Sequence, residues 1–397
     1  MPRKSKRWSY HVALLVESSR AYGRAVLQGV AQYAEKRPDW ILHFEPSGLE
    51  AGLPCWLRSW QGDGILARVT TPHMAKALQA TGLPVVDLRG FRLEGPFPCV
   101  LADNTCIAQR AFDHLYSCGL RHFAFCGSLR GQHPRLDQRG DEFQRCAVEA
   151  GFDCEAIYVW ERQCNNRSTW GRLIAWLKRL PKPTGILACN DDCGFQVLTA
   201  CRHAGIGVPE ELAILGVDND PVLCNLSRPS LSSIDLNGLQ IGYEAAGLLD
   251  RLMQGRKPPA EPVLVTPGNV IARGSTGVLT FTEPEVTAAV RFIREHACEG
   301  IRVRNVVERS FLSQRQLERL FQHYLGRSLK AELLRIQIEK AQQLLAETDL
   351  PVKTIAIRTG FRSEQYFSEA FFRQCGLRPT VYRQHHRASP EPLCSRG

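Results

Sequence analysis

The chain has 397 residues, of which 44% are hydrophobic and 23% charged, an ordinary balance for a folded protein that excludes wholesale disorder. No apolar run approaches the roughly 18 residues that span a bilayer, and the run at 12–16 is too short for a secretory signal, so we expect a cytoplasmic protein without a membrane partner. The formal net charge of +10 is unevenly spread, because residues 278–397 hold 19 Lys and Arg against 13 Asp and Glu, whereas residues 8–277 are balanced.

After a basic tail at residues 1–9, short apolar runs alternate with segments of helical period. The predicted strands are 11–16, 40–44, 64–67, 85–87, 99–102, 122–126, 156–159, 185–188, 213–217 and 231–234. The helical segments between them include 20–35, 105–118, 140–150, 169–178, 194–204 and 238–254. Alternating strands and helices predict parallel sheets, and ten strands are many for one compact sheet. We therefore predict an α/β domain over residues 10–275 with two lobes, each a doubly wound parallel sheet.

Polar side chains follow several of these strands, at the edge where doubly wound sheets bind ligands. Carboxylates and amides accept hydrogen bonds from vicinal hydroxyls, an arginine donates to sugar oxygens, and an aromatic face covers the C–H side of a sugar. On this ground we select as ligand-binding candidates Ser18, Tyr22, Asp103, Arg139, Asn190, Asp191 and Asp218. An aspartate after a strand is also a common helix N-cap, so a purely structural role stays open for each.

Four short motifs in this region resemble the sugar-binding domains of the LacI family and of periplasmic binding proteins. They are Asp103-Asn104, Arg139 with Phe143, Cys189-Asn190-Asp191, and Leu215-Gly-Val-Asp218. The resemblance implies a two-lobed, periplasmic-binding-protein-like fold that holds a small sugar between its lobes. By position, it also implies that Arg139, Asn190, Asp191 and Asp218 contact that sugar. Since only about nine residues precede the first predicted strand, we do not expect the helix-turn-helix that precedes this domain in the LacI family.

Pro and Gly residues then interrupt the pattern and predict a linker at 276–284. An all-α domain over residues 285–386, followed by a tail at 387–397, is predicted from helical segments at 285–296, 303–308, 313–324, 329–346, 352–359 and 363–375. Its two halves are alike, since each has a short apolar helix, a tight turn, a serine at an N-cap position and a longer helix. This layout predicts two helix-turn-helix units joined by the helix at 329–346.

The second helix of a helix-turn-helix unit can lie in the major groove of DNA, where Arg reads guanine, Gln reads adenine and Glu accepts from cytosine. Candidate contacts to double-stranded operator DNA are therefore Ser313, Arg315, Gln316, Arg319, Arg362, Ser363, Glu364 and Gln365. The positive charge of this third of the chain favours a polyanionic partner. For each single residue, the alternative is an ordinary exposed position on a helix.

The all-α region resembles the DNA-binding domain of the AraC family of transcription regulators. The likeness rests on Ile355-Ala356, Gly360-Phe361-x-Ser363, Tyr366-Phe367-Ser368 and Gly376-Leu-Arg-Pro379. The chain departs from the family where Ser310-Phe311 replaces the usual turn glycine and where Gln337 and Glu369 replace common arginines. A LacI-type sugar domain followed by an AraC-type DNA domain is similar to the bacterial xylose operon regulators. That order implies a homodimeric activator with D-xylose as effector and with a possible contact to RNA polymerase.

The 15 cysteines are scattered, odd in number and without C-x-x-C spacing, so we expect reduced thiols, no metal and no cofactor. A metabolic kinase or dehydrogenase is not expected, since no phosphate-cradling glycine loop follows a strand, and no catalytic residue is predicted. Three alternatives stay open: a regulator of the same architecture for a different sugar, a sugar receptor for transport or chemotaxis, and a DNA-repair alkyltransferase with an AraC-type module.

Overall fold

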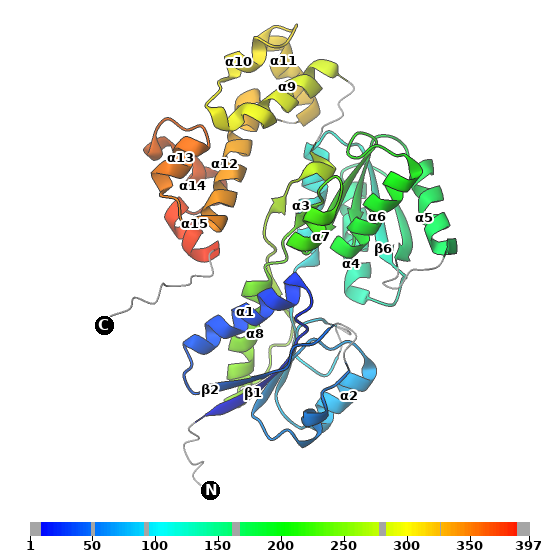
Figure 1. The fold of residues 1–397 in the computed structure, drawn as a ribbon, viewed down its shortest axis with the longest axis vertical. Coiled ribbons are helices and arrows are strands. Elements are labelled where there is room, and N and C mark those ends of the chain that lie inside the picture. Colours follow the sequence, from blue (N-terminus) through cyan, green and yellow to red (C-terminus); the bar gives the residue numbers. More distant parts are fainter. Residues whose placement is uncertain are drawn as a thin grey trace. The chain divides into compact units, whose positions relative to one another are not determined.

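The structure is a computed structural model that describes residues 9–48, 52–90, 95–160, 167–277, 283–325 and 327–386 (Figure 1). The chain divides into two compact units, the first of Met1–Tyr116 and Leu120–Gly277, the second of Ser117–Gly119 and Val278–Gly397. Apart from residue 9, the predicted tails at 1–9 and 387–397 lie outside the described residues. Of the predicted linker at 276–284, residues 278–282 also lie outside them.

The first lobe of the first unit contains a parallel sheet with the strand order β2-β1-β3-β4. A single parallel bridge from Asp87 to Cys99 continues it to β5, which pairs with β11. Strand β3 is buried at every position, as expected for a sheet with helices on both faces. The strands of this lobe are β1 (Tyr10–Leu15), β2 (Trp40–Phe44), β3 (Gly64–Ala67), β4 (Val85–Asp87), β5 (Val100–Ala102) and β11 (Val263–Val265). Its helices are α1 (Ala21–Glu35), η1 (Cys55–Ser59), α2 (Pro72–Ala80) and α8 (Gly238–Met253).

Helices α1 and α8 lie side by side in this lobe (Figure 1). Two glycines allow this close approach. A Cβ at Gly29 would lie 1.9 Å from the carbonyl oxygen of Leu239, and a Cβ at Gly242 would lie 2.0 Å from that of Val26. Only a residue without a side chain fits either position. Helix α8 follows the first five strands of the second lobe in sequence, yet its apolar face, with Ile241, belongs to the core of the first lobe.

The second lobe contains a six-stranded sheet with the order β12-β10-β9-β8-β6-β7. All neighbours are parallel except β10 and β12. Its strands are β6 (His122–Ser128), β7 (Cys154–Trp160), β8 (Thr184–Ala188), β9 (Leu212–Val217), β10 (Ser232–Ile234) and β12 (Val270–Ile271). Its helices are α3 (Asn104–Ser117), α4 (Pro134–Glu149), α5 (Arg167–Arg179), α6 (Asp191–Ala204), α7 (Pro221–Leu226) and η2 (Gly274–Thr276).

The prediction of two lobes with parallel sheets is confirmed, and the chain passes between the lobes three times, at 102–104, 234–238 and 265–270. The predicted start of the helix at 140 was wrong. Helix α4 begins at Pro134, because proline fits the first helical position, where its missing N–H is not needed. Arg139 therefore lies within this helix and does not open it. Strands β11 and β12 escaped prediction because three and two residues are too few to show a period.

The described part of the second unit is all-α, as predicted. Helices α10 and α11 form one helix-turn-helix unit, α13 and α14 form the other, and α12 joins them. The helices are α9 (Pro284–His296), η3 (Ala297–Glu299), α10 (Val303–Val307), α11 (Gln314–Leu325), α12 (Leu329–Glu347), α13 (Val352–Arg358), α14 (Glu364–Cys375) and α15 (Pro379–His386). None of the described helices of either unit is both long and apolar enough to cross a membrane.

The two turns are held differently. Gly360 in the second turn has a φ of +82°, and a Cβ there would lie 2.7 Å from the carbonyl oxygen of Ala297, so glycine is required. The first turn lacks glycine. Instead the Glu285 carboxylate accepts hydrogen bonds from the Ser310 hydroxyl at 2.5 Å and from the Phe311 N–H at 3.1 Å. A carboxylate from α9 thus stabilises the turn that departs from the AraC pattern.

Candidate functional site

A cavity of about 510 Å³ lies between the two lobes of the first unit. Its volume is within the range of roughly 300–1,000 Å³ that is typical of small-molecule sites. Both lobes line it, with residues that follow strands and with residues at the start of α2 and α4. The polar lining residues of the first lobe include Glu17, Arg20, Tyr22, Arg68 and Arg89, and those of the second lobe include Asn104, His133, Arg135, Arg139, Asn190 and Asp218.

In the first lobe, Glu17 is the central acceptor. It follows β1 and is only 6% exposed, and its carboxylate accepts from the Arg68 guanidinium at 3.0 Å and from the Arg20 N–H at 3.2 Å. The Arg68 guanidinium also lies 5.7 Å from the centre of the Tyr22 ring. Burial raises the pKa of Tyr22 to about 12, so its hydroxyl stays a neutral donor at physiological pH. The lobe therefore presents an acceptor, a cation and an aromatic ring to the cavity.

In the second lobe, Arg139 is a buried, fixed donor. Its Nε donates to the Asn104 side-chain oxygen at 3.1 Å, and its Nη1 donates to the Cys189 carbonyl. Burial lowers the pKa of Arg139, while the negative charge of Asp218 acts in the opposite direction. Asn190 lies beside it, and its side-chain oxygen caps α6 by accepting from the Cys193 N–H at 2.9 Å. The amide nitrogen of Asn190 has no protein partner among the described residues.

Asp218 is held in an unusual backbone conformation at the end of β9. Its φ is +118° and that of Asn219 is +52°, in a region that side-chain-bearing residues rarely adopt. Asp191 stabilises this segment, since its carboxylate accepts from the Asp220 N–H at 2.7 Å and from the Ser233 hydroxyl at 2.6 Å. The Ser233 oxygen in turn accepts from the Asn219 N–H at 3.0 Å. Asp191 therefore acts as a positioning residue for Asp218.

The carboxyl groups of Asp218 and Asp191 affect each other's titration. Burial raises the pKa of Asp218 to about 6, opposed by the positive charges of Arg139 and Arg20. Burial also raises the pKa of Asp191 well above its usual value, and the charge of Asp218 adds to this effect. Two carboxylates this close do not ionise independently. Burial thus brings the pKa of Asp218 closer to neutral pH than that of an ordinary carboxyl group.

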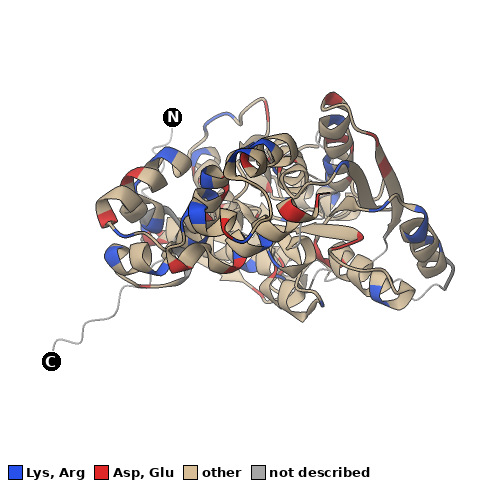
Figure 2. Cartoon of the chain, turned by 90° about the horizontal axis from the view of Figure 1, so that it is seen from above, with Lys and Arg blue, Asp and Glu red and all other residues tan. Residues whose placement is uncertain are grey.

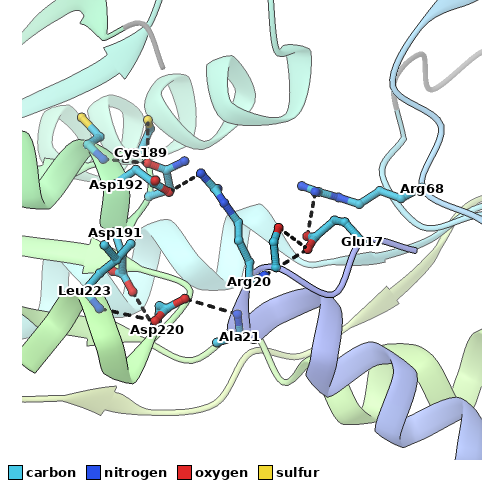
Figure 3. A network of polar contacts seen from close by, with 12 residues as sticks. Glu17, Arg20, Ala21, Arg68, Cys189, Asp191, Asp192, Asp220 and Leu223 are labelled. Atoms are coloured by element: carbon cyan, nitrogen blue, oxygen red, sulfur yellow. Dashed lines mark hydrogen bonds and ion pairs between the residues drawn. The ribbon is translucent and has the colours of Figure 1, made fainter. Parts of the chain in front are cut away.

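The start of α1, with the preceding Arg20, makes two contacts between the lobes (Figure 3). The Arg20 guanidinium forms an ion pair of 2.7 Å with Asp192 in the first turn of α6. The Ala21 N–H donates to the Asp220 carboxylate at 3.2 Å. Arg20 makes no side-chain cap of α1, so a carboxylate from the other lobe meets the positive end of this helix. The sequence analysis did not foresee these contacts, because they join residues about 170 or more positions apart.

Four of the seven predicted ligand residues line the cavity, namely Tyr22, Arg139, Asn190 and Asp218. Ser18, Asp103 and Asp191 do not appear among the described lining residues. Asp103 accepts from the N–H groups of Thr105 and Cys106 at the start of α3, which is the alternative role of a helix cap. Glu17, Arg68, Arg89 and Arg135 were missed, although Glu17 directly follows a predicted strand.

All eight predicted DNA contacts are exposed on the second unit. Ser313 and Gln316 bond to each other as a capping box, with the Gln316 oxygen accepting from the Ser313 N–H at 3.0 Å. The Ser363 hydroxyl accepts from the Tyr366 N–H at 3.3 Å and caps α14. The side chains of the other five form no hydrogen bond or ion pair with described residues: Arg315, Arg319, Arg362, Glu364 and Gln365. Lys and Arg are interspersed with Asp and Glu along both units (Figure 2).

No group of three or more His, Cys, Asp or Glu side chains within the described ranges is placed to hold a metal ion. The 13 described cysteines are all free thiols. Burial raises the pKa of several of them, including Cys189 and Cys193, which keeps these thiols protonated.

Comparison with known proteins establishes the family. The chain is 32% identical to the xylose operon regulatory protein of Escherichia coli K12 over 381 residues, which cover 94% of this chain and 97% of the relative. The protein of the same name from Haemophilus influenzae is 32% identical over 94% of this chain and 98% of the relative. The chain belongs to the family of xylose operon regulators. It is therefore a DNA-binding transcription regulator, as the order of its domains predicted.

Family models match the regulator in three consecutive segments. They are a XylR N-terminal domain at 11–101, a periplasmic binding protein-like domain at 112–276 and a helix-turn-helix domain at 306–385. A solved structure described as the xylose-binding transcription activator xylR is similar over 95% of this chain and 98% of that one, with 31% identity and a TM-score of 0.62. A LacI-type regulator from Alkaliphilus metalliredigens QYMF, complexed with D-xylulofuranose, covers 67% of this chain at 20% identity and a TM-score of 0.52, and shows the fold alone.

Proposed function

We propose that this regulator senses a small sugar, with D-xylose the favoured effector, and activates sugar-catabolic genes in response. One observation carries the proposal: polar residues of both lobes line the same cavity. The names of the relatives support a pentose, since two of them are xylose operon regulatory proteins and a similar solved structure is described as xylose-binding. We further propose that the protein acts in the cytoplasm, where it has access to DNA.

The bound sugar would bridge the lobes. On the second lobe Arg139 would donate and Asp218 would accept, and on the first lobe Arg68 would donate and Glu17 would accept. The ring of Tyr22 would cover one face of the sugar. A charge-assisted hydrogen bond contributes roughly 1.5–3 kcal/mol. Converting a mostly open population into a mostly closed one needs about 5.5 kcal/mol of differential binding. A few such bonds that form only when both lobes contact the sugar are enough.

The second unit would read DNA with α11 and α14. Helix α12, which joins the two helix-turn-helix units, has 19 residues, so it is about 28 Å long at ~1.5 Å per residue. That length is comparable to one turn of DNA, ~34 Å, and suits two helices in successive major grooves on one face of the duplex. We propose that Arg315, Arg319 and Gln365 contact bases, and that two copies of the chain bind a pair of half-sites. Contact with RNA polymerase belongs to the same proposal.

The test is a ligand screen followed by a DNA-binding assay. Thermal unfolding of the full chain is measured with pentoses and hexoses, and the ligand that raises Tm most is then titrated by calorimetry. Binding to a labelled operator fragment is measured by fluorescence anisotropy with and without that ligand. We expect D-xylose to raise Tm and to change operator affinity. A chain that binds operator DNA identically with every sugar would contradict the proposal.

A further inference from the structure

Phe311 is a large apolar side chain that projects into the solvent from the second unit. It lies in the turn between α10 and α11 and is 99% exposed, whereas the other large apolar side chains that the structure describes as exposed reach 64% at most. Contact of a whole phenyl ring with water is unfavourable, and packing within this chain does not offset it. The stability of the unit therefore does not explain a phenylalanine at this position.

The backbone that carries Phe311 is held in place on both sides. The Glu285 carboxylate, in the first turn of α9, accepts from the Phe311 N–H at 3.1 Å. The Ser310 hydroxyl donates to the same carboxylate, and its oxygen accepts from the Leu312 N–H at 3.1 Å. Helices α9, α10 and α11 pack against one another around this turn (Figure 1). Because the turn is already ordered, a partner that covers the ring pays little conformational entropy.

The surroundings of Phe311 indicate the chemistry of that partner. Residues 302–319, which include the turn, hold five arginines against two glutamates, and Glu285 lowers this excess without removing it. Arg315 and Arg319 follow the turn on the exposed face of α11, whose opposite face is buried. An apolar protein surface would leave this positive charge uncompensated, whereas the phosphates of DNA compensate it. The C5 methyl group of thymine is the apolar group that DNA exposes in its major groove.

We propose that Phe311 is a specificity-determining residue for DNA, whose ring contacts the C5 methyl group of a thymine beside the bases that Arg315 contacts. This inference rests on the proposed function, in which α11 lies in the major groove. Residues at the start of such a helix reach the base edges, and Phe311 comes two positions before the N-cap of α11, Ser313. An apolar contact with the methyl group favours thymine at that position. The turn thereby adds a base preference that a glycine cannot supply.

Removal of single methyl groups from the DNA tests the contact. A duplex that the full chain prefers is obtained by selection from random sequences with D-xylose present. Each thymine of this duplex is then replaced in turn by deoxyuridine, which lacks only the C5 methyl group, and affinity is measured by fluorescence anisotropy. We expect at least one thymine whose replacement weakens binding about three- to tenfold, because an apolar contact is lost.

The variant F311A tests whether Phe311 makes this contact. F311A should bind the selected duplex about three- to tenfold more weakly, and it should lose nothing further when the critical thymine is replaced, because both changes remove the same contact. The salt dependence of its affinity should stay unchanged, since no charge is removed. F311L should retain part of the preference for thymine.

The fold of the variant and the choice of residue are both controlled. Because Phe311 is almost fully exposed, F311A should have the Tm and the sugar affinity of the unchanged chain. F44A removes another exposed phenylalanine, on β2 of the first unit, and should leave the affinity for both duplexes unchanged.

Three results have different meanings. If F311A stayed as sensitive as the unchanged chain to deoxyuridine at every position, the contact with thymine would be overturned. If F311A bound the selected duplex with unchanged affinity while R319A bound it more weakly, the inference would fail and α11 would keep its proposed role; a loss of transcription activation in F311A would then indicate a protein partner. Unchanged affinity of both F311A and R319A would overturn the proposed role of α11 itself.

Discussion

Arg20 and Asp192 form an ion pair of 2.7 Å that joins the first lobe to the second. Arg20 precedes α1 and Asp192 lies in the first turn of α6, so the pair links the ends of β1 and β8. Their side chains are 18% and 25% exposed, so water screens the pair only in part. A movement of one lobe relative to the other either keeps this ion pair or breaks it. Removing the pair should therefore change the equilibrium between the open and closed arrangements of the lobes.

Asp192→Asn should weaken binding of the effector about two- to fivefold. The substitution removes a partly exposed ion pair worth about 0.5–1 kcal/mol, while Asp192 is not among the described lining residues. Calorimetry measures the change. Asp141→Asn, which breaks the exposed pair with Arg130, serves as the control and should have no effect on the sugar. Tighter binding by Asp192→Asn would mean that the pair stabilises the unliganded arrangement instead.

Asp218→Ala should abolish the response to sugar and leave basal DNA binding intact. The variant removes a carboxylate acceptor from the cavity, and the loss of one or two charge-assisted bonds corresponds to at least about tenfold in affinity. Calorimetry with the sugar and anisotropy with operator DNA are measured on the same preparation. Unchanged sugar affinity would remove Asp218 from the site.

Sugar binding should depend on pH near 6. Burial raises the pKa of Asp218 to about 6, so the carboxylate takes up a proton as the pH falls through that value and becomes a poorer acceptor. Affinity should decline from pH 7 to pH 5. The free energy of unfolding of the sugar-free protein should change in the opposite direction. The folded protein binds this proton more readily than the unfolded chain does, so this group adds to the free energy of unfolding as the pH falls from about 6 towards 4. Asp218→Asn should flatten both profiles.

Gly216→Ala should destabilise the segment that carries Asp218. A Cβ at Gly216 would lie 2.2 Å from Oδ1 of Asp191, which accepts from the Ser233 hydroxyl. The displaced carboxylate should reduce the free energy of unfolding by about 1–3 kcal/mol and lower sugar affinity. Gly171→Ala is the matched control, since nothing lies within 4 Å of its Cβ on α5, and it should stabilise the chain slightly. The free energy of unfolding is measured with denaturant, and an equal decrease in both variants would count against this role of Gly216.

Arg319→Ala should weaken operator binding without changing sugar affinity. Arg319 is exposed on α11 and has no partner among the described residues, so its removal disturbs no contact within the unit. A contact to DNA of this kind is worth about 1–3 kcal/mol if it is made to a base. Anisotropy at several salt concentrations distinguishes the cases, because loss of a phosphate contact lowers the salt dependence. Equal operator affinity of both proteins would exclude α11 as a recognition helix.

Much of the fold could be predicted from the sequence, because strands such as β1 and β9 are apolar runs, buried at the centre of β1 and throughout β9, and the helices between them have clear periods. The two helix-turn-helix units were equally clear, since Gly360 and the serine caps mark their turns. The predicted start of α4 was wrong because its first turn is largely polar and shows no hydrophobic period. Whether the residues bind sugar or DNA remains a prediction.

The lining of the cavity was only partly predicted, because residues that are far apart in the sequence meet there. Tyr22, Arg139, Asn190 and Asp218 could be chosen because each lies near a strand end or in a recognisable motif. Arg68, Arg89 and Arg135 could not, since an arginine in sequence does not reveal whether it faces a cavity or water. Asp191 illustrates the opposite case: it was chosen as a ligand, and its carboxylate instead bonds Asp220 and Ser233.

The three passages of the chain between the lobes affect how the protein is made. The first lobe needs α8 for its core and β11 for its sheet edge, and these elements end at Met253 and Val265. A nascent chain that has reached only residue 102 therefore exposes an unfinished apolar face. The strands from β6 to β10, by contrast, are consecutive in sequence and can assemble earlier during synthesis. The first lobe can therefore complete its fold only after almost the whole of the second lobe has been synthesised.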